Sequence, residues 1–65
     1  MDNELAIRDA IEKRSIQILN IDDSFQPCLN IIKGEFPGID RFVVIESIVN
    51  AIVEIEFKRM DNNIL

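Results

Sequence analysis

Few side chains in this sequence can take part in catalysis or metal binding. The chain has one cysteine, Cys28, and no histidine. Without histidine, neither a Ser-His nor a Cys-His pair can activate a nucleophile within one chain. A single cysteine excludes an internal disulfide, and structural zinc sites are built from several cysteine and histidine ligands. The sequence therefore predicts that the protein is not an enzyme and has neither a cofactor nor a metal site.

Cys28 is expected on or beside the apolar face of a short helix. A reactive thiol needs a positively charged environment, but the residues shortly before it include two acids, Asp22 and Asp23. We therefore expect Cys28 to be a structural, partly buried thiol. A lone cysteine also fits a reducing compartment, which predicts a cytoplasmic protein.

Three polar residues, Glu46, Asn50 and Glu54, follow one another at four-residue intervals. This spacing places them on one side of a helix. Neighbouring carboxylates can bind a divalent cation, but polar side chains at this spacing are more typical of a solvated helix face. Ser47 falls in the same polar arc, so we predict that this side of the helix faces solvent.

The charge of the chain disfavours nucleic acid as a partner. The formal net charge is −5, with six acids against four bases in residues 1–33 and six against three in residues 34–65. Proteins that bind nucleic acid usually carry a basic patch. The acidic first residues are also unlike a secretion signal, and the most apolar stretch, residues 42–57, is too short and too rich in glutamate to cross a membrane.

The arrangement of apolar residues and helix-breaking residues predicts three helices. Ile7, Ala10 and Ile11 form an apolar stripe at helical spacing near the start of the chain. Pro37 and Gly38 form the strongest break, and Asp40 is placed to cap the helix that follows. The expected fold is all-α, a single small domain over residues 1–65 with helices at about 2–19, 24–35 and 40–60.

The third helix is expected to be apolar over too wide an arc for a small monomer. Eleven of the sixteen residues in 42–57 are apolar, and at 100° per residue most of them fill an arc of about 200°, twice what a surface helix needs. A 65-residue chain without disulfide or metal also tends to need association for stability. We therefore predict an obligate homodimer that self-associates through Ile45, Ile48, Val49, Ile52 and Ile55.

Two further apolar residues of this helix, Val43 and Phe57, fall on its polar side. They are predicted to contact a different protein. Together with the missing catalytic groups, these features predict a small non-enzymatic regulator or adaptor that acts by protein–protein interaction as a homodimer.

Residues 15–21 leave a second fold open, because their apolar residues partly alternate as in a strand. A strand at 15–21, a helix at 24–35 and another at 41–55 would resemble the ribbon-helix-helix arrangement, which dimerises through paired strands. This resemblance implies a DNA-binding repressor or antitoxin. Against it, Leu19 is apolar at an outward strand position, and the acidic charge opposes phosphate binding. The DNA contacts in this alternative would be Arg14, Ser15 and Gln17.

Overall fold

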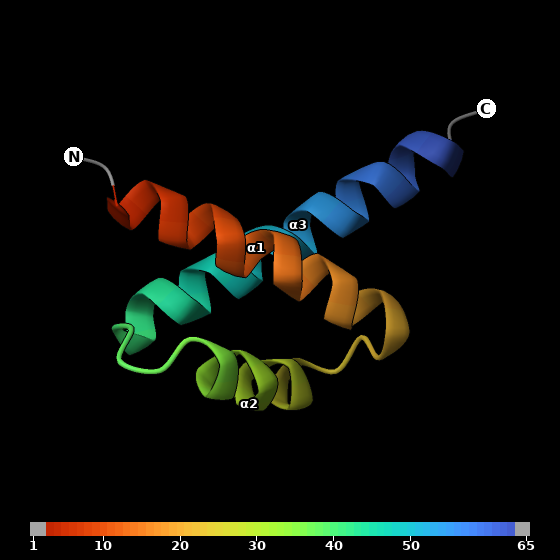
Figure 1. Cartoon of the computed structure of the whole chain (residues 1–65). Coiled ribbons are helices and arrows are strands. Elements are labelled where there is room, and N and C mark those ends of the chain that lie inside the picture. The colour runs from red at the N-terminus through yellow and green to blue at the C-terminus, as the bar shows by residue number, and fades with distance from the viewer. Residues whose placement is uncertain (1–2, 64–65) are drawn as a thin grey trace.

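The computed structural model describes residues 3–63, which form three α-helices and contain no strand (Figure 1). The helices are α1 (Asn3–Ile21), α2 (Phe25–Glu35) and α3 (Arg41–Asn63). The predicted all-α fold is confirmed, and each helix end lies within three residues of its prediction. The predicted start of the first helix, at residue 2, lies outside the described residues.

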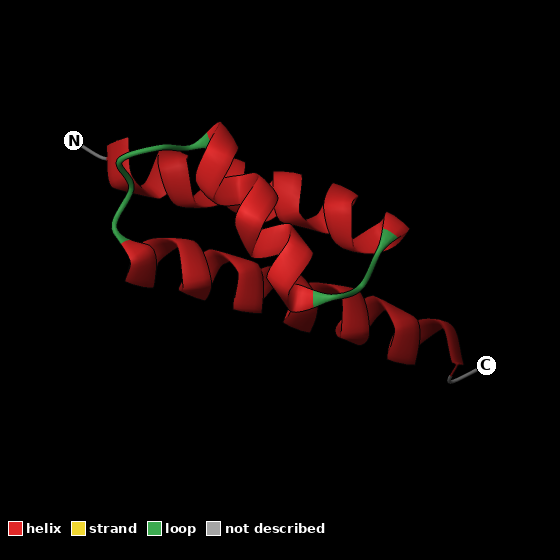
Figure 2. Cartoon of the chain, turned by 90° about the horizontal axis from the view of Figure 1, so that it is seen from below, coloured by secondary structure: helices red, strands yellow, loops and turns green. Residues whose placement is uncertain are grey.

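Helices α1 and α3 cross each other, and α2 packs across both of them on one side (Figures 1 and 2). The radius of gyration is 12.3 Å, whereas a compact domain of this length has a value of about 10.7 Å. The principal extents are 42, 28 and 16 Å. The molecule is therefore thin in one direction, and the C-terminal part of α3 extends past the other two helices (Figures 1 and 2).

One apolar core joins the three helices. Two buried hydroxyl groups lie in it, and both are satisfied within their own helix. Ser15 Oγ donates to the Ile11 carbonyl at 2.7 Å, and Ser47 Oγ donates to the Val43 carbonyl at 2.8 Å, so burying them leaves no unpaired polar group. The buried apolar residues are Ile11, Ile18, Leu19, Cys28, Ile32, Val44, Ile48 and Ala51.

Ser47 corrects one expectation from the sequence. It lies in the core and is 1% exposed, although its position in the helical pattern placed it on the solvated side. Ser47 and Ala51 are the small residues that α3 buries, and small side chains let a crossing helix approach closely. Because the Ser47 hydroxyl bonds to its own backbone, the side chain can face the core without a solvent contact.

Residues 15–21 are helical, in agreement with the all-α prediction. The strand that the alternative fold requires at these residues is not present. Ile11, Ser15 and Ile18 are buried along one side of α1, which continues the helical spacing through the ambiguous stretch. The ribbon-helix-helix alternative is therefore not supported. Ser15 is 0% exposed, so it cannot contact a DNA base in this fold.

The turn between α2 and α3 is formed by the residues that predicted it. Gly38 has a φ of +84°, in the left-handed region that glycine adopts without strain. The Asp40 carboxylate then accepts the N–H of Phe42 at 2.8 Å, and the Asp40 carbonyl accepts the N–H of Val44 at 3.1 Å. Asp40 is therefore the N-cap of α3, as predicted.

The start of α2 is capped differently. Ser24 occupies the N-cap position with an extended backbone, but its side chain makes no capping hydrogen bond. One of the two N–H groups that such a side chain can bind belongs to the third helical residue, and that residue is Pro27, which has none. Asp22 instead accepts the N–H of Ser24 at 3.1 Å, so the acid orders the turn before the helix.

Candidate functional site

The most distinctive surface is a row of exposed apolar side chains along α3. Four residues in this row are between 44% and 70% exposed, and at 100° per residue they lie within about 40° of one another on the helix. The row extends over about 27 Å of helix. Two half-buried isoleucines flank it on the side toward the core. We call this surface the α3 stripe, and it consists of Phe42, Ile45, Val49, Ile52, Val53 and Met60.

The α3 stripe is exposed because the other two helices cover only the opposite side of α3. Val44, Ile48 and Ala51 are the apolar residues of α3 that are buried, and they lie at intervals of four and three residues, along one narrow line. The apolar arc expected from the sequence is therefore about half covered by the chain itself. The uncovered half is what a partner would have to bury.

The residues predicted for self-association fall into three environments. Val49 is 44% exposed, in the middle of the α3 stripe. Ile45 and Ile52 are half-buried at its edge, and Ile55 is half-buried against the core. Ile48 is 0% exposed inside the chain's own core. Ile48 is therefore removed from any surface that a second copy could contact, because α1 and α2 already occupy its surroundings.

The two residues predicted to contact another protein differ in accessibility. Phe57 is 70% exposed, on a part of α3 that has no core residue. Val43 is half-buried. Both lie on the side of α3 away from Ile48, with Phe57 about 80° around the helix from Val49. Their role in binding a partner stays a prediction.

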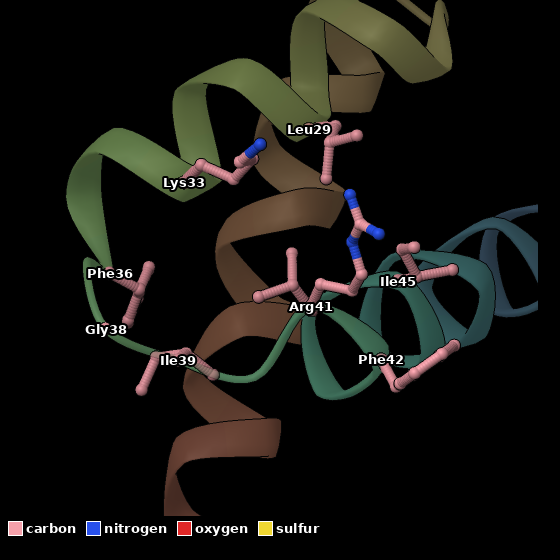
Figure 3. Close-up of a pocket in the computed structure, with 9 residues that line it drawn as sticks. Leu29, Lys33, Phe36, Gly38, Ile39, Arg41, Phe42 and Ile45 are labelled. Carbon is pink, nitrogen blue, oxygen red and sulfur yellow. The ribbon is translucent and has the colours of Figure 1, made fainter.

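A hollow of about 320 Å³ lies between α2 and the first turns of α3 (Figure 3). Most of its lining is apolar. Two basic side chains also line it, Lys33 from α2 and Arg41 from α3, and Figure 3 shows their charged ends directed to the space between these helices. We call this the α2–α3 hollow. Its apolar lining includes Leu29, Phe36, Ile39, Phe42, Val44 and Ile45.

Lys33 and Arg41 were not recognised as a pair from the sequence. They are eight residues apart, and the turn through Gly38 separates them. Only the reversal of the chain at this turn brings the end of α2 and the start of α3 to one site (Figure 3). The available signal was the turn itself, since Pro37-Gly38 between two amphipathic helices indicates that their adjoining ends lie close.

The carboxylates on the polar side of α3 are partly used within the chain. Arg8 of α1 donates from Nη1 to Glu46 Oε1 at 2.6 Å and from Nη2 to Glu4 Oε2 at 3.1 Å. These two bonds raise the pKa of the Arg8 guanidinium. Within residues 3–63, no three metal-ligating side chains come close enough together to hold an ion. Glu46 therefore serves as a link between α1 and α3.

Arg14 and Gln17, which the alternative fold assigned to DNA, are engaged in an intramolecular network. Arg14 donates from Nε and Nη2 to the two carboxylate oxygens of Glu35, both at 2.8 Å, and from Nη1 to Gln17 Oε1 at 3.1 Å. This two-point ion pair joins α1 to the end of α2. The hydrogen bonds and charge of Arg14 lower the pKa of Glu35, and those of Glu35 raise the pKa of Arg14.

The Arg14–Glu35 pair predicts a dependence of stability on pH. Because the pKa of Glu35 is lower in the folded chain, the pair stabilises the fold fully above the ordinary glutamate value of about 4.3. This contribution is lost as the pH falls through the lower folded-state pKa. Glu35→Gln is therefore expected to lower the urea midpoint at pH 7 but not at about pH 2. Glu12→Gln is the control, since Glu12 forms no ion pair with another described residue; an equal effect of both variants at pH 7 would contradict the prediction.

Cys28 is fully buried, with 0% of its surface exposed, whereas only partial burial was expected. Burial raises the pKa of its thiol, and this effect outweighs the hydrogen bond with Ser15 and the charge of Arg14, which lower the pKa. The thiol therefore stays protonated at neutral pH, and the nucleophilic thiolate is scarce.

None of the helices in the described part of the chain has a stretch long and apolar enough to cross a lipid bilayer. Comparison with models of known protein families gives no match. Comparisons with curated proteins and with solved structures give no significant match either. The surfaces of the chain itself are therefore the basis for assigning its function.

Proposed function

We propose that the protein is a small non-enzymatic regulator or adaptor that works in the cytoplasm through protein–protein contacts, as a homodimer formed along α3. The observation that carries this proposal is the α3 stripe. Soluble monomers rarely expose a long continuous apolar surface, and such a surface usually marks a site of interaction. The single free cysteine, Cys28, supports a reducing compartment.

The shape of the chain supports self-association. Its smallest extent is 16 Å. The apolar residues that α3 buries, Val44, Ile48 and Ala51, all lie on one side of that helix. Two copies that meet along their α3 stripes would each cover the other's exposed side, and a symmetric pair needs only one self-complementary surface.

The spacing within the α3 stripe also supports a helix pair. From Phe42 to Ile52, four of its members are separated by three, four and three residues, the spacing of a coiled-coil seam. The next two positions of this pattern are Glu56 and Arg59, whose side chains form an exposed ion pair at 3.1 Å. The apolar seam therefore covers about two heptads, and the contact between copies would be centred near Val49.

Sedimentation equilibrium of the purified chain tests the proposed dimer. Between about 1 and 100 μM, we expect a mass of twice the 7.5 kDa chain, because a dimer whose dissociation constant is well below about 1 μM stays associated over this range. A mass equal to a single chain over the whole range, with the helical circular dichroism retained, would contradict the proposal.

A further inference from the structure

We propose that the α2–α3 hollow is a docking site for an acidic segment of a partner protein, which places one apolar side chain between its own flanking carboxylates. The inference rests on the proposed role as an adaptor. The α2–α3 hollow shares Phe42 and Ile45 with the α3 stripe, but its two basic residues and the rest of its lining lie outside the stripe. The evidence for the inference is the combination of an apolar lining with two basic groups at one place.

The α2–α3 hollow is large enough to hold an apolar side chain of a partner. At about 320 Å³, the α2–α3 hollow lies at the lower end of the usual range for ligand pockets, about 300–1,000 Å³. This volume accommodates one large apolar side chain and part of its backbone. Phe42, on the wall of the site, is 70% exposed in the single chain, so an inserted side chain would also contact an aromatic ring.

The two basic groups give the site its preference for acids. Four of the seven basic residues in the chain are in ion pairs with described acids: Arg8, Lys13, Arg14 and Arg59. Lys33 and Arg41 make no ion pair within the described residues, and both line the α2–α3 hollow. Two cations thus have no counter-ion among the described residues, at one apolar site of a chain whose net charge is −5.

An acidic occupant satisfies both groups in different ways. The guanidinium of Arg41 can bind a carboxylate through two parallel hydrogen bonds, while the ammonium of Lys33 acts as a mobile point charge. The basic groups come from two helices, so carboxylates on both sides of one apolar side chain match them better than a single acid. A nucleic acid fits less well, because the acidic remainder of the chain would repel its phosphates.

A random library of twelve-residue peptides displayed on phage tests this inference without assuming a sequence. Selection on the full chain is expected to enrich peptides that carry an apolar side chain between acids. Synthetic copies should bind with dissociation constants of about 10–100 μM. Nuclear magnetic resonance shifts on binding should centre on residues 33–45.

Reversing the charges of Lys33 and Arg41 tests whether the selected peptides bind at the α2–α3 hollow. The double variant Lys33→Glu with Arg41→Glu is expected to weaken the selected peptides by more than about tenfold, because it replaces attraction with repulsion at the site. The matched control is Lys13→Glu with Lys58→Glu. It changes two exposed lysines elsewhere and gives the same net charge, so it should weaken binding by less than about threefold. Circular dichroism verifies that both variants keep their helices.

Several results would overturn the inference. They are the absence of any enriched pattern, the enrichment of peptides without acids, and an equal loss of binding in both double variants. Sedimentation in the same samples separates this inference from the proposed dimer. Specific peptide binding by a chain that sediments as a monomer would refute the dimer alone, whereas a dimer that selects no acidic peptide would refute the docking site alone.

Discussion

Ile48→Ala is expected to lower the free energy of unfolding by about 3 kcal/mol, because it removes three carbons from a fully packed core and leaves a cavity. Ile48 is 0% exposed where α1 and α2 meet α3. A chain of 65 residues has a total stability of about 3–10 kcal/mol, so one such cavity is a large part of the total. Urea unfolding, followed by circular dichroism at a fixed protein concentration, measures the change.

Leu5→Ala is the control for this prediction. Leu5 is a large apolar residue of α1 that is 66% exposed, and its truncation should change stability by less than about 0.5 kcal/mol. If Ile48→Ala cost no more than Leu5→Ala, the crossing of α1 and α3 described for this chain would be wrong.

Val49→Asp, one residue further along α3, is expected to have the opposite outcome. Val49 is 44% exposed at the centre of the α3 stripe, so a carboxylate there meets water in the single chain and the fold is retained. In the proposed dimer, two such carboxylates would be buried close to each other without partners, which costs several kcal/mol. We expect the dissociation constant of the dimer to rise by more than about 100-fold, since each 1.4 kcal/mol is a factor of ten.

Asn50→Asp is the matched control, because it adds the same charge at the next position, on the side of α3 away from the stripe. Sedimentation equilibrium should show a single chain for Val49→Asp and a dimer for Asn50→Asp. A stable dimer of Val49→Asp would place the interface elsewhere. If Val49→Asp lost both the dimer mass and the helical circular dichroism, folding and association would be a single step.

Much of the fold was predictable because local signals determine it. The turn at Pro37-Gly38 and the N-cap at Asp40 follow from the backbone preferences and side-chain chemistry of these residues, and the structure confirms both. Residues 15–21 were ambiguous because so short a run fits a strand or a helix. Ile18 and Leu19 are buried in the core that α1 shares with α2 and α3. Their burial is a tertiary effect, which the local pattern does not contain.

The surfaces were less predictable than the helices. The width of the apolar arc on α3 indicated that one chain would leave part of it uncovered, but not which part. The side of α3 that becomes buried depends on where α1 crosses it, and this crossing buries Ser47 and leaves Val53 59% exposed. The α2–α3 hollow likewise depends on the path of the chain around Gly38, which the composition of that turn does not specify.

The end of α3 has a consequence for how the chain responds to a partner. From residue 56 to residue 61, no side chain of this helix belongs to the core, and all six residues are exposed. These turns therefore have little tertiary support, and their helical state depends mainly on local hydrogen bonds. A partner that packed beside them would stabilise this state, so part of its binding free energy would go into ordering the last turns of α3.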